Sequence, residues 1–269
     1  MKKRLFASVL SLFLLVGSFA ACKEKSGNTS DTASSSPSSS EPLKPGEWDL
    51  SDVDISHIKS DKLIAFTLDD GPHAKTRDLI EVFKNFNEQN PDFTAHATLF
   101  NIGNQFSPAY KMVLQSAHEV GFEMGNHTYT HANLTSISDE DIAKEIDSTD
   151  ILLKEIDGKD RHLIRPPGGN YNEHTLSLAP APMIFWSNGL DTIDWQQQIT
   201  EDNIYSSVIN NLRPGGIVLM HQKYEKTINA VKRLLPALMR KGYQVVSVSE
   251  LAKYYGFELF TGQIYSELN

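Results

Sequence analysis

The stretch KLIAFTLDDGP, residues 62–72, combines a buried strand with a chemically reactive turn. Its first seven residues are largely apolar, β-branched or aromatic, which predicts a strand. Asp69 and Asp70 follow this run directly, and the Gly-Pro pair after them favours a tight turn. The stretch therefore predicts two adjacent carboxylates at the carboxyl end of a strand.

Six further runs of this kind follow, and amphipathic helical patterns separate several of them. The runs cover residues 95–100, 122–125, 162–165, 183–187, 216–221 and 244–248. Between the first two strands, Leu79, Val82, Phe83 and Phe86 recur at helical spacing. Strands that alternate with helices predict a parallel sheet with right-handed crossovers. Seven such units predict an α/β fold, a distorted (β/α)7 TIM-like barrel that forms a single domain.

The overall composition is that of an ordinary globular domain. Of the 269 residues, 40% are hydrophobic and 22% are charged. The formal net charge is -9, so no basic surface is expected that could release counterions from nucleic acid. Only one cysteine is present, which excludes an intrachain disulfide. We therefore expect no nucleic-acid partner.

The first 45 residues have the pattern of an export signal and a tether. Three basic residues precede an apolar run at residues 5–19, and this run is shorter than the roughly 20 residues of a spanning helix. The segment resembles a bacterial lipoprotein signal, in which Cys22 would become the lipidated first residue. We expect a signal peptide at 1–21, a Ser/Pro-rich tether at 22–45 and the domain at 46–269. The alternative is a plain secreted protein with a free cysteine.

The segment HTYTH, residues 127–131, places two histidines four positions apart. On one turn of a helix, His127 and His131 would project side by side and could bind one metal ion. Asp70 is the best candidate for a third ligand, which leaves Asp69 to address a bound water. By itself the histidine spacing is weak evidence, and the aspartates could simply close a turn.

Three more strand ends carry polar side chains. Arg165 begins the segment RPPGGNY and can hold a carboxylate through two hydrogen bonds. Asp191 and Trp195 bound the segment DTIDW, and His221 ends the segment LMH. Because barrel enzymes carry their chemistry at the carboxyl ends of the strands, these groups are expected on one face. Taken singly, each also fits a simple loop, a capped turn or a core histidine.

Together these segments resemble the polysaccharide deacetylases of carbohydrate esterase family four. Five motifs carry the resemblance in the family's order, within residues 62–251: TLDDG at 67–71, HTYTH at 127–131, RPPGG at 165–169, DTIDW at 191–195 and LMH at 219–221. The resemblance implies a distorted barrel of about seven strand-helix pairs as a single catalytic domain. Two positions depart from the family, which more often has Phe at position 68 and Tyr at position 168.

The resemblance also implies a role for each motif residue. Asp70, His127 and His131 would bind a divalent metal, usually Zn²⁺, although Co²⁺ or another divalent ion can serve. Asp69 would be the general base, and Arg165 would orient it.

The later motifs complete these implied roles. His221 would be the general acid, and an aspartate would hold it protonated, with Asp194 favoured over Asp191. The Gly168 N–H would meet the developing oxyanion, and Trp195 and Leu219 would line the substrate site.

The implied activity is removal of N-acetyl groups from polysaccharide that contains N-acetylglucosamine, at the cell envelope. The expected partner is an acetylated polysaccharide or oligosaccharide. The protein would be a monomer on the outer face of the bacterial cytoplasmic membrane, held there only by its lipid.

Three other functions are alternatives to this activity. An O-acetyl esterase acting on a glycan such as xylan would need the same groups, and a noncatalytic carbohydrate-binding lipoprotein would keep the fold. A glycoside hydrolase would need two carboxylates about 5–10 Å apart across a sugar, which adjacent aspartates fit poorly.

Overall fold

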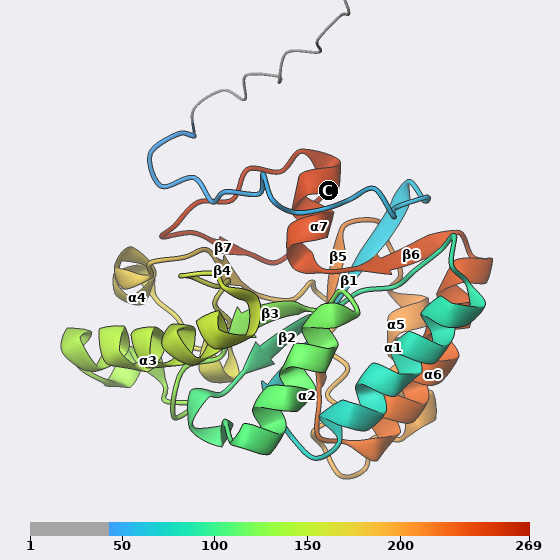
Figure 1. The fold of residues 1–269 in the computed structure, drawn as a ribbon, viewed down its shortest axis with the longest axis horizontal. Coiled ribbons are helices and arrows are strands. Elements are labelled where there is room, and N and C mark those ends of the chain that lie inside the picture. The colour runs from blue at the N-terminus through green and yellow to red at the C-terminus, as the bar shows by residue number, and fades with distance from the viewer. Residues whose placement is uncertain (1–42) are drawn as a thin grey trace, which may run out of the picture. The chain divides into compact units, whose positions relative to one another are not determined.

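Strand β1, Lys62–Gly71, is the centre of the sheet in the computed structural model, which describes residues 43–269 (Figure 1). Strand β5, Gly216–His221, pairs in parallel along one side of β1. On the other side, β6, Tyr243–Val246, pairs with the first half of β1, and β2, Thr98–Asn101, pairs with the second half. Strand β3, Glu123–Asn126, extends the sheet beyond β2, again in parallel. The near-continuous apolar sequence of β1 reflects burial on both faces.

Isolated bridges rather than full ladders continue the sheet beyond these strands. Ile164 pairs in parallel with Asn126 at the end of β3 and with Met183 in β4, Met183–Ile184. Strand β4 pairs with β7, Ile264–Tyr265, and a bridge from Glu267 to Gly216 leads back to β5. The expected α/β fold with a parallel, distorted barrel is confirmed. The prediction of a strand at 162–165 is wrong, because only Ile164 in this range forms bridges to neighbouring strands. Strand β7 was not predicted.

Seven helices within the described residues connect or cover the strands. They are α1 (Thr76–Gln89), α2 (Pro108–Glu119), α3 (Asp139–Asp157), α4 (Glu173–Leu178), α5 (Glu201–Asn210), α6 (Glu225–Arg240) and α7 (Val248–Tyr255). Short 3₁₀ turns are η1 (Gly103–Gln105), η2 (Leu134–Ser136) and η3 (Pro167–Gly169). Local sequence explains both ends of α3: Ser138 caps its first turn, and Gly158 ends the helix in the left-handed conformation.

The largest apolar cluster lies between the sheet and helices such as α1, α2 and α6, whose apolar faces carry the predicted helical spacing. A second cluster joins β1 to α7 and to the segment around Trp48, and α7 lies with this segment along one end of the fold (Figure 1). No helix within residues 43–269 is both long and apolar enough to cross a membrane. The expected signal peptide, Cys22 and nearly all of the expected tether lie outside the described residues.

A buried ion pair beside α3 makes stability depend on pH. His162 has both ring nitrogens on carboxylates, with Nδ1 2.9 Å from Asp150 and Nε2 3.1 Å from Asp157. Burial alone would lower the pKa of His162, but the two carboxylates raise it to about 9. Because the folded-state pKa exceeds the unfolded value of 6.5, this stabilisation is complete below pH 6.5 and is lost as pH rises through 9.

We therefore expect the free energy of unfolding, measured by urea titration, to be lower at pH 10 than at pH 7 by roughly 3 kcal/mol. His162→Gln should lower stability at pH 7 and remove most of this dependence. His174→Gln, at an exposed histidine that contacts Asp139, is the matched control. An unfolding profile that is flat over this range in the unmodified protein would contradict the prediction.

Candidate active site

A cleft of about 340 Å³ opens at the carboxyl ends of β1 and β5. Most of the residues expected to form the site line it: Asp69, Asp70, His127, His131, Gly168, Asp191, Trp195, Leu219 and His221, joined by Gly169, Trp186, Lys223 and Tyr224. Arg165 and Asp194 are fully buried and contact lining residues from behind. The topology thus brings together five motifs that are spread over 155 residues of sequence, from 67 to 221.

Asp70, His127 and His131 form a cluster that could hold one metal ion. Oδ1 of Asp70 lies 3.5 Å from Nε2 of His127 and 3.4 Å from Nε2 of His131. Ligand atoms held at about 2.0–2.1 Å around a single tetrahedral zinc ion lie roughly 3.3–3.4 Å apart. The three donors and their spacing therefore fit a divalent cation.

The hydrogen bonds of His127 present its Nε2 lone pair to this cluster. Its Nδ1 lies 2.7 Å from the carbonyl oxygen of Arg165, which can only accept, so Nδ1 carries the proton. An outer hydrogen bond of this kind is the usual way in which a protein orients a metal-binding imidazole. The backbone of Arg165 thereby positions a neighbouring motif.

The two histidines do not lie on a helix, so that part of the sequence interpretation is wrong. Residues 127–131 form an irregular loop after β3, and the two rings meet edge to face with centroids 4.8 Å apart. Asp70, Thr128 and His131 each have φ of 63°. A left-handed backbone at a non-glycine residue costs roughly 1–3 kcal/mol and persists only where its surroundings impose it. Two of the three candidate ligands and a neighbour therefore carry this strain, as does Ile193, next to Asp194, with φ of 45°.

Side chains outside the motifs impose this loop conformation. Asn126 accepts a hydrogen bond from the Thr128 backbone N–H, and its amide donates to Asp150 at 2.8 Å. Glu145 on α3 accepts hydrogen bonds from the backbone N–H groups of Tyr129 and Thr130. Glu145 and Asp150 were not predicted from the sequence, since nothing in the local pattern of α3 shows which loop it packs against.

Asp69 is held by a guanidinium that is fully buried. Nη1 of Arg165 lies 3.3 Å from each carboxylate oxygen of Asp69. The remaining donors of Arg165 bond to the Ile184 carbonyl, the Phe185 carbonyl and the Thr67 hydroxyl. Burial lowers the pKa of Arg165, and the Asp69 carboxylate opposes this shift. Asp69 thus has a fixed orientation, with Oδ2 3.9 Å from Nε2 of His127.

Asp194, and not Asp191, contacts His221. Oδ1 of Asp194 lies 2.5 Å from Nδ1 of His221, and Oδ2 accepts from the His221 N–H at 2.8 Å and from the Thr227 hydroxyl. Burial disfavours the imidazolium, but Asp194 outweighs it and raises the pKa of His221. Asp191 instead accepts from the Ile193 N–H, and burial raises the pKa of its carboxyl.

The remaining predicted positions shape the cleft. Gly168 has φ of 61°, a conformation that glycine adopts without strain. Trp195 is 55% exposed, so its indole face is free to contact a ligand, whereas Leu219 is buried in β5 with only an edge at the cleft.

Lys223 is a charged residue in the cleft that the sequence analysis missed. Its Nζ lies 2.7 Å from Oδ2 of Asp70. Burial alone would raise the pKa of Asp70, but His127 and Lys223 outweigh it and hold that pKa well below its usual range. Lys223 follows His221 by two residues, and that proximity was the only signal that could have indicated it.

The sequence matches the family model described as polysaccharide deacetylase over residues 57–181. A peptidoglycan-N-acetylglucosamine deacetylase of Bacillus cereus is 34% identical over 203 residues, which are 72% of this chain and 90% of that protein. The peptidoglycan-N-acetylmuramic acid deacetylase PdaC of Bacillus subtilis is 30% identical over 191 residues, which are 71% of this chain but only 38% of PdaC. The similarity to PdaC is therefore to one part of a longer protein.

A solved structure has the same fold. The T48 deacetylase with substrate superposes with a TM-score of 0.69 at 28% identity, covering 76% of this chain and 96% of that one. The family-model match ends before Asp191, Asp194 and His221, while the B. cereus match extends over a longer part of the chain.

Proposed function

The chain belongs to the polysaccharide deacetylase family, and on that premise we propose that it hydrolyses N-acetyl groups on polysaccharide that contains N-acetylglucosamine. The observation that carries the proposal is one cleft in which Asp69, His221 and the cluster of Asp70, His127 and His131 meet. The names of the B. cereus and B. subtilis relatives support peptidoglycan as the substrate.

Asp70, His127 and His131 would hold the metal ion, and we propose zinc because two imidazoles and one carboxylate are a zinc donor set. Such an ion polarises an acyl oxygen and lowers the pKa of a bound water. Two ligands have their orientation set by the protein, His127 through the Arg165 carbonyl and Asp70 through Lys223.

The chain's own residues would move two protons. Asp69 takes a proton as water attacks the acetyl carbon, and Arg165 holds the Asp69 carboxylate in place. The Gly168 N–H would donate to the oxyanion, a contact worth roughly 3–4 kcal/mol in other enzymes. His221, held by Asp194, gives its proton to the amide nitrogen as the carbon–nitrogen bond breaks. The products are acetate and a free amino sugar.

The direct test is acetate release from a panel of acetylated glycans, with and without a chelator. We expect peptidoglycan and N-acetylglucosamine oligomers to release acetate, and we expect chelator to stop the release. New reducing ends would instead indicate a glycoside hydrolase, and release from acetylated xylan alone would indicate an O-acetyl esterase. Glycan binding without any acetate release would contradict the proposal.

Replacing Asp194 should shift the pH profile. If His221 acts as the protonated acid, activity is lost as pH rises through its pKa, which Asp194 raises. Asp194→Asn should therefore move the alkaline limb of kcat/KM to lower pH and reduce kcat at pH 8 by about 10- to 100-fold. Asp191→Asn is the matched comparison, and a shift as large in that variant would refute the role given to Asp194.

We also propose that the domain at 46–269 is tethered to the outer face of the cytoplasmic membrane through a lipid on Cys22. The short apolar run and the small residues before Cys22 support this proposal. In a Cys22→Ala variant, the protein should leave the membrane fraction almost completely. Full retention in that fraction would contradict the lipid anchor, and cell fractionation with immunoblotting measures it.

A further inference from the structure

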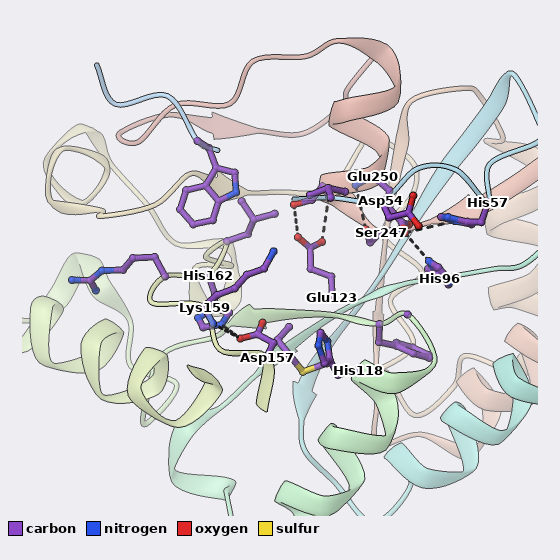
Figure 2. Close-up of a pocket in the computed structure, with 18 residues that line it drawn as sticks. Asp54, His57, His96, His118, Glu123, Asp157, Lys159, His162, Ser247 and Glu250 are labelled. Atoms are coloured by element: carbon purple, nitrogen blue, oxygen red, sulfur yellow. Dashed lines mark hydrogen bonds and ion pairs between the residues drawn. The ribbon is translucent and has the colours of Figure 1, made fainter. Parts of the chain in front are cut away.

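A second cavity, of about 280 Å³, lies away from the cleft, near the amino ends of β2 and β3. It is lined by residues from the segment that precedes β1, from the chain just before β2, from the start of β3 and from α7 (Figure 2). No residue of this cavity belongs to the proposed catalytic cleft. This cavity is therefore separate from the proposed deacetylase site.

Three metal-binding side chains converge at one side of this cavity. Oε1 of Glu250 lies 2.6 Å from Nδ1 of His96 and 3.6 Å from Nε2 of His57, and Figure 2 shows both rings beside the carboxylate. The two imidazole rings are 4.2 Å apart between centroids. One donor atom from each residue lies within 4.8 Å of the others. Within residues 43–269, the only other group of this kind is Asp70, His127 and His131.

The backbone holds two of these side chains in place. Glu250 closes the capping box of α7, so its Oε2 accepts from the Ser247 N–H at 2.8 Å and its Oε1 faces the histidines. A Cβ on Gly121 would lie 2.3 Å from Nε2 of His96, so only glycine leaves room for that ring. These residues come from separate segments, and the tertiary fold brings them together.

The hydrogen bonds do not account for all three groups. His96 and Glu250 satisfy each other, but Nε2 of His57 is buried and finds no hydrogen-bond partner among the described residues. A buried polar atom left unpaired costs roughly 1–3 kcal/mol, so a simple hydrogen-bonded cluster explains the arrangement poorly. A cation would use this lone pair together with a ring nitrogen of His96 and a carboxylate oxygen of Glu250, and its binding would replace the 2.6 Å hydrogen bond between His96 and Glu250.

We propose that His57, His96 and Glu250 bind a second divalent cation, with zinc as the ion that best matches two imidazoles and a carboxylate. Water in the adjoining cavity would supply the fourth ligand. The ion links the segment before β1 to α7 and to the chain just before β2, so its role is to stabilise this end of the fold. Ions that bind only the folded state raise its stability by mass action.

The experiment measures how many equivalents of zinc the untagged, full-length protein binds tightly. The protein is first stripped of metal and is then titrated with ZnCl₂ in the presence of a weak competing chelator. We expect two equivalents in the unmodified protein and one in His127→Ala, which lacks a ligand of the proposed catalytic site. Adding His57→Gln or Glu250→Gln to His127→Ala should remove the remaining equivalent and the rise in Tm that zinc produces. Glu250→Gln keeps an acceptor for the Ser247 N–H and so tests the ligand rather than the helix cap.

His118→Gln is the matched control, because His118 lines the same cavity but lies outside the cluster. In the His127→Ala background this variant should still bind one equivalent. A single equivalent in the unmodified protein that is lost in His127→Ala overturns the proposal, whether or not the double variants fold. As single changes, His57→Gln and Glu250→Gln should leave acetate release unaltered, so failure of this proposal is distinct from failure of the deacetylase assignment.

Discussion

Asp69→Asn should reduce kcat for acetate release by about 10²- to 10⁴-fold while the zinc content stays unchanged. The reason is that Asp69 contacts Arg165 and lies beside the metal cluster, but is not part of it. An amide cannot take the proton of the attacking water, yet it has nearly the same shape and still offers an oxygen to Arg165. The loss should therefore appear in kcat and not in metal binding.

A control measurement must show that Asp69→Asn still folds. Arg165 is fully buried, and removing the charge of its partner leaves a less compensated cation, which can cost several kcal/mol. Circular dichroism and Tm measured with the zinc content will show whether the site is intact. Turnover within twofold of the unmodified protein, with zinc bound, would refute the role of Asp69 as the general base.

His127→Ala should abolish turnover and remove one equivalent of zinc. His127 supplies one of three donors at the cluster, and its Nδ1–H bond to the Arg165 carbonyl also anchors the loop after β3. Because a bound cation contributes several kcal/mol to stabilising transition-state charge, we expect at least about a 10³-fold loss of kcat. Elemental analysis of the dialysed protein and an acetate assay measure the two effects.

His174→Ala is the matched control, since His174 is an exposed histidine on α4 whose ring pairs with Asp139 and does not line the cleft. It should keep full zinc content and activity. Zinc content that is unchanged in His127→Ala would show that the cluster is not the metal site. Recovery of activity in His127→Ala at high zinc concentration would show weakened binding and would support the assignment.

Strand prediction succeeded best where a segment is buried on both faces. The strand predicted at 216–221 has those bounds in the structure, and β1 begins where expected. The predicted strand at 162–165 shrinks to single bridges at Ile164, and β7 was missed altogether. Such short segments become strands only when a neighbouring chain offers hydrogen-bond partners, which local sequence cannot show.

The candidate site was also predicted from the sequence only in part. Residue types and motif order predicted the histidines, the aspartate pair, Arg165 and His221, which the fold brings together, although no single motif was decisive. The sequence did not reveal the loop that carries His127 and His131, because its left-handed residues are imposed by Asn126 and Glu145.

The sequence by itself indicated the fold class, the family and most of the side chains that line the cleft, since apolar periodicity and motif chemistry are local properties of the chain. Only the tertiary structure decided which groups face one another. It placed Asp194 rather than Asp191 on His221, brought Lys223 to Asp70, and joined His57, His96 and Glu250 across 194 positions of sequence, from 57 to 250. The physical reason is that contacts between distant segments depend on how the sheet closes and how the helices pack, and no local pattern encodes either.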